Sequence, residues 1–133
     1  MARMSVRCLI QGNNFSPSKA EKIAGVIFSD MNEPGAIGNA GRYRGIAIPY
    51  GSATLESVVS DNQLDNLDAL LNKLKCSIVK FREAGADDVT LHCDVFYEDQ
   101  CNIEFSAAQI TCLSKMEIAV TISCYKCCNQ EHD

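Results

Sequence analysis

The sequence predicts an α+β domain, a two-layer sandwich in which a mostly antiparallel sheet carries its helices on one face. Three observations predict this class. The chain has 133 residues, 47% of them hydrophobic, which suffices for one continuous core. Apolar residues alternate with polar ones in segments 5–10 and 89–95, as in strands that bury one face. Between them, leucines recur at helical spacing over residues 64–81.

The first element is a strand, followed directly by a helix. The alternation from Ser5 to Ile10 predicts the strand. Ser16 and Pro17 predict the helix start, because serine is a preferred N-cap and proline at the first helical position loses no hydrogen bond. Gly25 is a residue type common just past a helix, so we expect the helix to end there.

A long loop and a short strand follow. Residues 32–45 hold four of the eight glycines and show no helical or strand period, which predicts a loop of functional or flexible character. The segment lacks the Gly-Lys-Ser/Thr phrase of a phosphate loop, so we interpret it as an excursion that exposes Arg42, Tyr43 and Arg44. Residues 46–50 predict a strand, at a sheet edge because Pro49 has no N–H to donate.

The second helix gives the clearest pattern, from about Asp61 to Gly85. Its apolar positions are spaced 3, 4, 3, 4 and 3 residues apart, which predicts one buried stripe. Residues 75–77 interrupt the apolar pattern, so a bend or a split into two helices stays open. The stripe consists of Leu64, Leu67, Leu71, Leu74, Ile78 and Phe81.

The last part of the chain predicts a hairpin, a helix and a final strand. Residues 88–97 alternate as a strand, and a turn at 98–100 leads to an antiparallel partner at 101–105. Ser106 predicts the N-cap of a helix that runs to about residue 115. The segment 118–125 is apolar and β-branched enough for a central strand. The expected order is β-α-β-α-β-β-α-β in a single domain over 1–133, with a polar tail at 126–133.

These features together resemble a widespread family of small bacterial domains, formally of unknown function. The likeness lies in the phrase from Val6 to Gly12, in residues 15–17, in the Leu67–Leu74 repeat and in residues 105–125. It spans about residues 5–125. Members recur as immunity proteins in polymorphic-toxin and contact-dependent inhibition loci. The resemblance implies a non-enzymatic chain that binds and neutralises a cognate toxin, with the C-terminal toxin domain, a nuclease being one candidate, as its partner.

Acidic side chains form the candidate partner-binding surface. A net charge of −5 argues against a non-specific nucleic-acid binder, which needs a basic surface. Carboxylates on the second helix and in the turn at 98–99 could cover a cationic partner and accelerate association. The alternative is a solvated face stabilised by the helix macrodipole. The candidate partner-binding residues are Asp61, Asp65, Asp68, Glu98, Asp99 and Tyr43.

A C-terminal cluster of cysteines and one histidine supports the alternative function, a small cytosolic metal- or thiol-linked binding module. Zinc takes thiolate and imidazole ligands, and Cys-x-x-Cys suits one ligand pair, but a second such pair is missing. The leading expectation is therefore no metal and no cofactor. Neither of the two histidines has a recognisable acid partner or nucleophile signature, so we expect no enzyme. The cluster consists of Cys124, Cys127, Cys128 and His132.

No segment approaches the roughly 18 apolar residues that cross a bilayer. The N-terminal apolar run is too short for a signal peptide, so we expect a cytoplasmic protein without membrane contact. The eight cysteines should then be free thiols. We expect Cys8, Cys93 and Cys112 to act as small buried hydrophobic residues.

Overall fold

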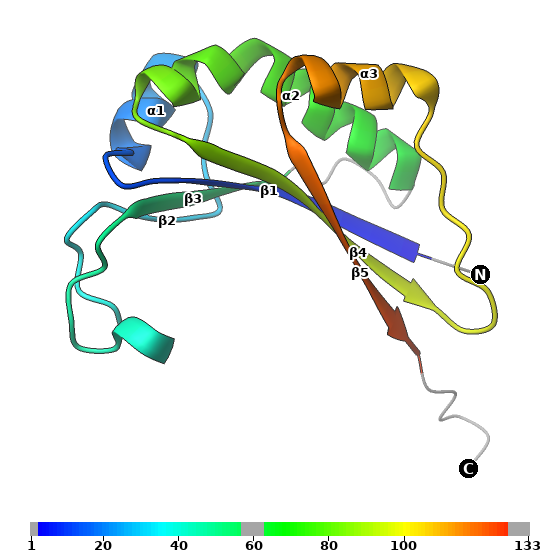
Figure 1. The fold of residues 1–133 in the computed structure, drawn as a ribbon, viewed down its shortest axis with the longest axis horizontal. Coiled ribbons are helices and arrows are strands. Elements are labelled where there is room, and N and C mark those ends of the chain that lie inside the picture. The colour runs from blue at the N-terminus through cyan, green and yellow to red at the C-terminus, as the bar shows by residue number, and fades with distance from the viewer. Residues whose placement is uncertain (1–2, 57–62, 128–133) are drawn as a thin grey trace.

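The computed structural model describes residues 3–56 and 63–127, with only the backbone given for 63–65. Within these residues, the three α-helices lie on one face of a five-stranded mixed sheet, which confirms the α+β class and the two layers (Figure 1). The strand order is β2-β3-β1-β4-β5, with every pairing antiparallel except β4 with β5. The elements are β1 (Arg3–Gly12), α1 (Pro17–Ala24), β2 (Asp30–Asn32), the 3-10 helix η1 (Gly41–Tyr43), β3 (Gly51–Glu56), α2 (Gln63–Glu83), β4 (Asp88–Tyr97), α3 (Ala107–Lys115) and β5 (Ala119–Lys126).

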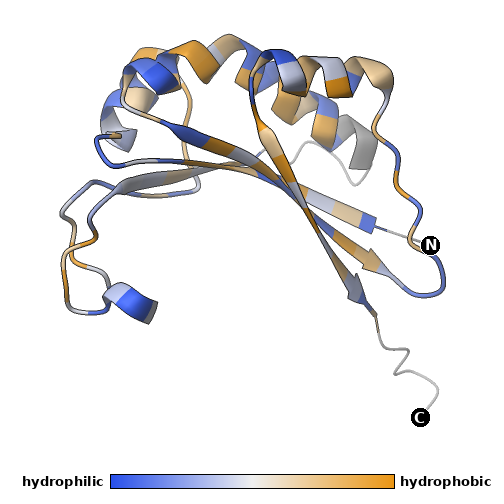
Figure 2. Cartoon of the chain, viewed as in Figure 1, coloured by the Kyte–Doolittle hydropathy of each residue, from blue (hydrophilic) through white to orange (hydrophobic). Residues whose placement is uncertain are grey.

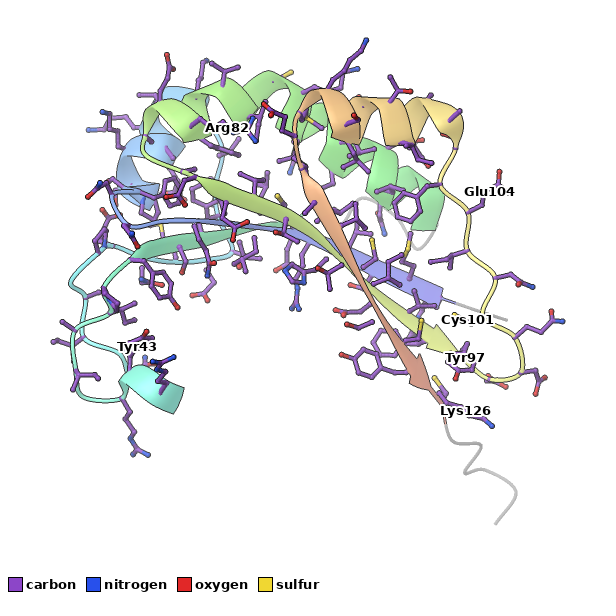
Figure 3. The ribbon with its side chains drawn as sticks, in the orientation of Figure 1. Tyr43, Arg82, Tyr97, Cys101, Glu104 and Lys126 are labelled. Atoms are coloured by element: carbon purple, nitrogen blue, oxygen red, sulfur yellow. The ribbon has the colours of Figure 1, made fainter. Side chains whose placement is uncertain are left out.

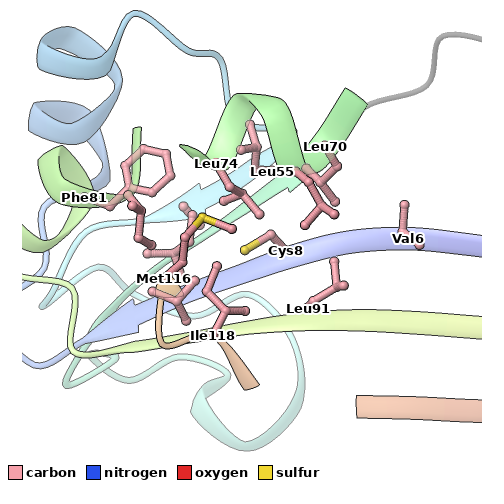
Figure 4. Close-up of a cluster of buried hydrophobic side chains, with 14 of the residues drawn as sticks. Val6, Cys8, Leu55, Leu70, Leu74, Phe81, Leu91, Met116 and Ile118 are labelled. Carbon is pink, nitrogen blue, oxygen red and sulfur yellow. The ribbon is translucent and has the colours of Figure 1, made fainter. Parts of the chain in front are cut away.

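The core lies between α2 and the strands β1 and β4 (Figure 4). Alternate residues of β1, among them Cys8 and Ile10, are fully buried on the side that faces the helices. The leucine stripe of α2 packs on this side, with Leu67 and Leu74 fully buried and Leu71 4% exposed. The predicted stripe is confirmed from Leu67 to Phe81, whereas the side chain of Leu64 lies outside the described residues. The helix α2 runs unbroken through residues 75–77.

Capping explains where α1 and α3 begin, as predicted. Ser16 Oγ accepts a hydrogen bond from the Lys19 N–H, and Gly25 ends α1 in a left-handed conformation at φ 69°. The Ser106 and Gln109 side chains form a reciprocal capping box at the start of α3. These short helices are therefore defined by local residues as well as by packing.

The 33–50 connection is anchored at its start by Glu33. Its carboxylate accepts hydrogen bonds from Ser16 Oγ (2.8 Å), the Ser18 N–H (2.9 Å) and Ser18 Oγ (3.0 Å). Slight burial acts to raise the pKa of Glu33, but these hydrogen bonds outweigh it, and the pKa is lowered. The connection leaves the β2–β3 side of the sheet and projects away from the helices (Figure 1).

The predicted order β-α-β-α-β-β-α-β is wrong in two places. The observed order is β-α-β-β-α-β-α-β: it contains the short strand β2, which the sequence did not predict, and no strand at 101–105. The strand predicted at 46–50 lies instead at 51–56, where Ala53 and Leu55 are buried against β1. Residues 46–50 form only an isolated bridge between Ile37 and Ala47, since Ile46 is 54% exposed and has no core to face.

The predicted hairpin between 88–97 and 101–105 is also wrong. Residues 100–106 have no strand conformation, and β4 pairs in parallel with β5 after a crossover through α3. Cys101, Ile103 and Phe105 alternate because their side chains pack against the core while the residues between them face solvent. The alternation of apolar and polar residues therefore shows that one side of this segment is buried, although the segment is not a strand and pairs with none.

Candidate binding surface

The last strand, β5, is a long edge of the sheet, where the sequence predicted a central strand. Its inner side pairs with β4, from Thr90 with Ala119 to Tyr97 with Lys126. In the part of the chain that the structure describes, no strand pairs with its outer side. An edge strand of eight residues offers unpaired N–H and C=O groups to another chain, whereas the opposite edge, β2, has only three residues.

An apolar groove runs between α3 and this edge. Val120 and Ile122 lie opposite Leu91 and Cys93 of β4, so their side chains point to the helix-covered side of the sheet. The helices do not bury them: Val120 stays 38% exposed and Ile122 46% exposed. Ile110 of α3 is 55% exposed on the other side of the groove. The groove has a volume of about 360 Å³ and is lined by Phe105, Ile110, Leu113, Ser114, Ile118, Val120 and Ile122.

Hydrogen bonds at both ends of α3 fix this wall of the groove. At its start, Gln109 Nε2 donates to Asp68 Oδ1 of α2 at 2.9 Å, while the other side of the same amide caps the helix. After its end, Glu117 takes a left-handed φ of 57°, and its carbonyl accepts from Arg82 Nη2 of α2 at 3.2 Å. A left-handed conformation is costly for a residue other than glycine, so this turn is held by its contacts.

The face of the sheet away from the helices carries a polar and aromatic group toward the C-terminal end of β5. The Phe96 and Tyr125 rings stack with centroids 5.4 Å apart, and the Arg3 guanidinium lies 5.3 Å from the Phe96 centroid. Arg7 Nη2 lies 3.8 Å from Asp94 Oδ2. Tyr125 is half exposed, so β5 presents side chains for contact on both of its faces. Figure 2 shows hydrophobic residues along this edge strand.

The structure describes some of the acidic candidate residues and not others. Asp61 lies outside the described residues, as does the side chain of Asp65. Asp68 is exposed and accepts the hydrogen bond from Gln109. Glu98 and Asp99 are exposed just after β4, on the half of the molecule that carries β5.

Tyr43 lies apart from these acids, at the far end of the molecule (Figure 3). Its ring contacts Tyr50 edge-on at 6.0 Å between centroids, and the Arg42 guanidinium lies 5.5 Å from its own centroid. Backbone hydrogen bonds, such as Gly38 N–H to the Ile46 carbonyl, order this projecting segment. The segment is a second exposed surface with its own side chains.

Two of the four candidate metal ligands lie among the described residues. Cys128 and His132 lie outside the described residues, while Cys124 and Cys127 are exposed. The described residues contain no group of three or more His, Cys, Asp or Glu side chains that could hold a metal ion. Cys124 instead lies beside Cys101, with the two Sγ atoms 3.5 Å apart.

Sequence reasoning missed both the groove and this thiol pair. It predicted a central strand at 118–125, because this segment carries none of the charges or prolines that commonly mark an edge strand. The expected burial of Cys8 and Cys93 is confirmed, and Cys112 is half buried. Burial raises the pKa of Cys8 to about 12, and burial together with the charge of Asp94 raises that of Cys93 to about 11.

Among the described residues, no helix is long and apolar enough to cross a membrane. The chain matches no protein-family model. No curated protein and no solved structure matches it either.

Proposed function

We propose that this chain is a non-enzymatic immunity protein that binds and neutralises a cognate bacterial toxin in the cytoplasm. The observation that carries a binding role is the eight-residue edge strand β5 beside an apolar groove. Exposed apolar patches next to unpaired backbone are typical of protein-binding surfaces. The toxin as partner comes from the family resemblance of residues 5–125.

In the proposed complex, an extended segment of the toxin pairs with the outer side of β5. Main-chain hydrogen bonds would supply affinity, and alternate side chains of the added strand would select the partner. Those side chains would enter the groove between Ile110 and Ile122, whose lining is largely apolar. No charged residue occurs from Ile118 to Tyr125, so pairing would desolvate no charge along this stretch.

Electrostatics favours a cationic partner. The chain carries a net charge of −5, and Glu98, Asp99 and Glu104 are exposed in the connection that leads from β4 to α3. Glu104 is labelled beside this connection in Figure 3. Carboxylates at the rim of an interface mainly accelerate association and reject partners of like charge. A toxin that acts on nucleic acid and is basic for that reason fits this surface.

The test replaces Ile122 by glutamate and measures affinity for a candidate toxin domain, taken from the reading frame beside the gene of this chain. A buried charge at the centre of the groove should weaken binding about 30-fold or more, the threshold of an interface hot spot. The matched control is Ile27→Glu, because Ile27 is 85% exposed near the opposite edge of the sheet. Circular dichroism and thermal melting verify that both variants fold.

The rival surface is tested in the same experiment with Ile46→Glu on the projecting segment. We expect wild-type affinity for Ile46→Glu and Ile27→Glu, and loss of cell protection for Ile122→Glu alone. A folded Ile122→Glu protein that binds the toxin as tightly as wild type contradicts the proposed interface. Loss of binding in Ile46→Glu alone would move the interface to the projecting segment.

A further inference from the structure

Two thiols from distant parts of the chain meet at the C-terminal end of β5. Cys101 lies in the connection between β4 and α3, and Cys124 lies on β5, 23 residues later. Their Sγ atoms are 3.5 Å apart. Cys101 is half buried and Cys124 is exposed, so a small reagent can reach the pair from solvent. Figure 3 shows Cys101 beside the ends of β4 and β5.

The fully buried cysteines differ chemically from this pair. The pKa of about 12 for Cys8 and about 11 for Cys93 keeps both protonated at neutral pH. Because the thiolate is the nucleophile in disulfide exchange, these two are inert in the folded protein. A disulfide reagent can therefore react with the accessible Cys101–Cys124 pair but not with the buried thiols of Cys8 and Cys93.

We propose that Cys101 and Cys124 form a modification site, a dithiol that a low-molecular-weight disulfide such as oxidised glutathione converts into an intramolecular disulfide. The Cys124 thiolate attacks one sulfur of glutathione disulfide and expels one glutathione thiolate. Cys101 then loses its proton, attacks the Cys124 sulfur of the mixed disulfide and expels the second glutathione thiolate. The protein loses two electrons and two protons, and glutathione disulfide becomes two glutathione thiols.

The order of the two steps follows from the environment of each sulfur. The side-chain hydrogen bond with Cys124 raises the pKa of Cys101, with a further contribution from desolvation. Either sulfur can donate in this contact, but Cys124 is exposed while Cys101 is half buried, so the more accessible Cys124 is the first nucleophile. Closure needs the sulfurs to approach from 3.5 Å to about 2.05 Å. This approach breaks no helix or strand hydrogen bond of Cys101, because residues 100–106 have neither conformation.

The disulfide would enclose α3 and most of β5 in one covalent loop. Phe105, Ile110 and Val120 line the groove from within that loop. Oxidation would therefore tie the β4–α3 connection to the edge strand and restrict opening of the groove. The proposal concerns the chain's own chemistry and does not depend on the identity of any partner.

The test treats the reduced, folded protein with oxidised glutathione, blocks free thiols and maps tryptic peptides by mass spectrometry. Trypsin places Cys124 alone in peptide 116–126, and places Cys93, Cys101 and Cys112 together in peptide 83–115. We expect these two peptides to be linked in wild type and in Cys127→Ser, and separate in Cys101→Ser. Fragmentation of the linked species should assign the bond to Cys101.

A second measurement on wild type makes the result independent of whether any variant folds. Hydrogen exchange of residues 98–106 should slow on oxidation and recover after reduction with dithiothreitol. Cys124 recovered only as a stable glutathione adduct, or linked to Cys127, would overturn the proposal. So would eight free thiols after exposure to excess oxidised glutathione.

Discussion

Replacement of Asp68 by alanine should loosen α3 from α2. Asp68 Oδ1 accepts from Gln109 Nε2 at 2.9 Å, and Gln109 is only 9% exposed. The other amide atom, Oε1, accepts from the Ser106 N–H at 2.9 Å, so one side chain both caps α3 and joins it to α2. The sequence analysis placed Asp68 among the candidate partner-binding residues, and this contact gives it a structural role as well.

The magnitude follows from the exposure of the two partners. An orphaned buried donor costs about 1–3 kcal/mol, but Asp68 is exposed and water can replace part of its role. We therefore expect Asp68→Ala to lower the free energy of unfolding by about 1 kcal/mol. Asp68→Asn keeps a carbonyl acceptor in the same place, so its cost should stay below about 0.5 kcal/mol.

Urea unfolding of the two single variants, Gln109→Ala and the double variant measures the coupling. A coupling energy of about 1 kcal/mol, at an unchanged dependence on urea concentration, supports the contact. Coupling near zero, or an Asp68→Ala protein as stable as wild type, would refute it. Asp68→Asn also separates the two roles: slower toxin association at wild-type stability would show that the charge acts at an interface.

Three further predictions concern the core, the anchored connection and the thiols. Leu71→Ala should lower the free energy of unfolding, measured with urea, by about 2–5 kcal/mol. Val79 is 67% exposed on the same helix, so Val79→Ala should change it by no more than about 0.5 kcal/mol. Similar values for both variants would contradict the packing of α2. Because the folded-state pKa of Glu33 is lowered, its contribution to stability is present above the ordinary value of 4.5 and is lost as the pH falls through the folded pKa; Glu33→Gln should flatten this part of the stability profile. Because the folded-state pKa of Cys8 is raised from 9.0 to about 12, its contribution to stability is present below pH 9 and is lost as the pH rises toward 12. A chromogenic thiol reagent at pH 8 should spare Cys8 and Cys93 in the native protein but titrate all eight cysteines after unfolding.

Elements defined by neighbouring residues were predictable from the sequence. Ser16 and Gly25 bound α1 where expected, and Ser106 starts α3, because caps act over three or four residues. The alternation in β1 and β4 and the stripe of α2 were equally readable, since each element buries one face. Local patterns therefore reported which side of each element faces the core.

Contacts between segments far apart in the chain were beyond such patterns. The segment from Cys101 to Phe105 alternates like a strand but packs over the core without a pairing partner. The meeting of Cys101 with Cys124 depends on the parallel crossover through α3, which places the end of β4 and the residues that follow it beside the end of β5. No local spacing connects residues that only the topology brings together.

The composition of β5 explains why the sequence prediction placed this strand wrongly, and it also supports the proposed function. Ile118 to Tyr125 has the apolar, β-branched composition of a central strand, and for that reason it was predicted to be one. Natural edge strands are commonly blunted by charges, proline or bulges, and the described part of β5 carries no charge before Lys126 and no proline. A strand from a partner, added to the outer side of β5, would turn the edge into an interior position and cover Val120 and Ile122. The composition that misplaced β5 in the sequence prediction is therefore the composition that such a complex would require.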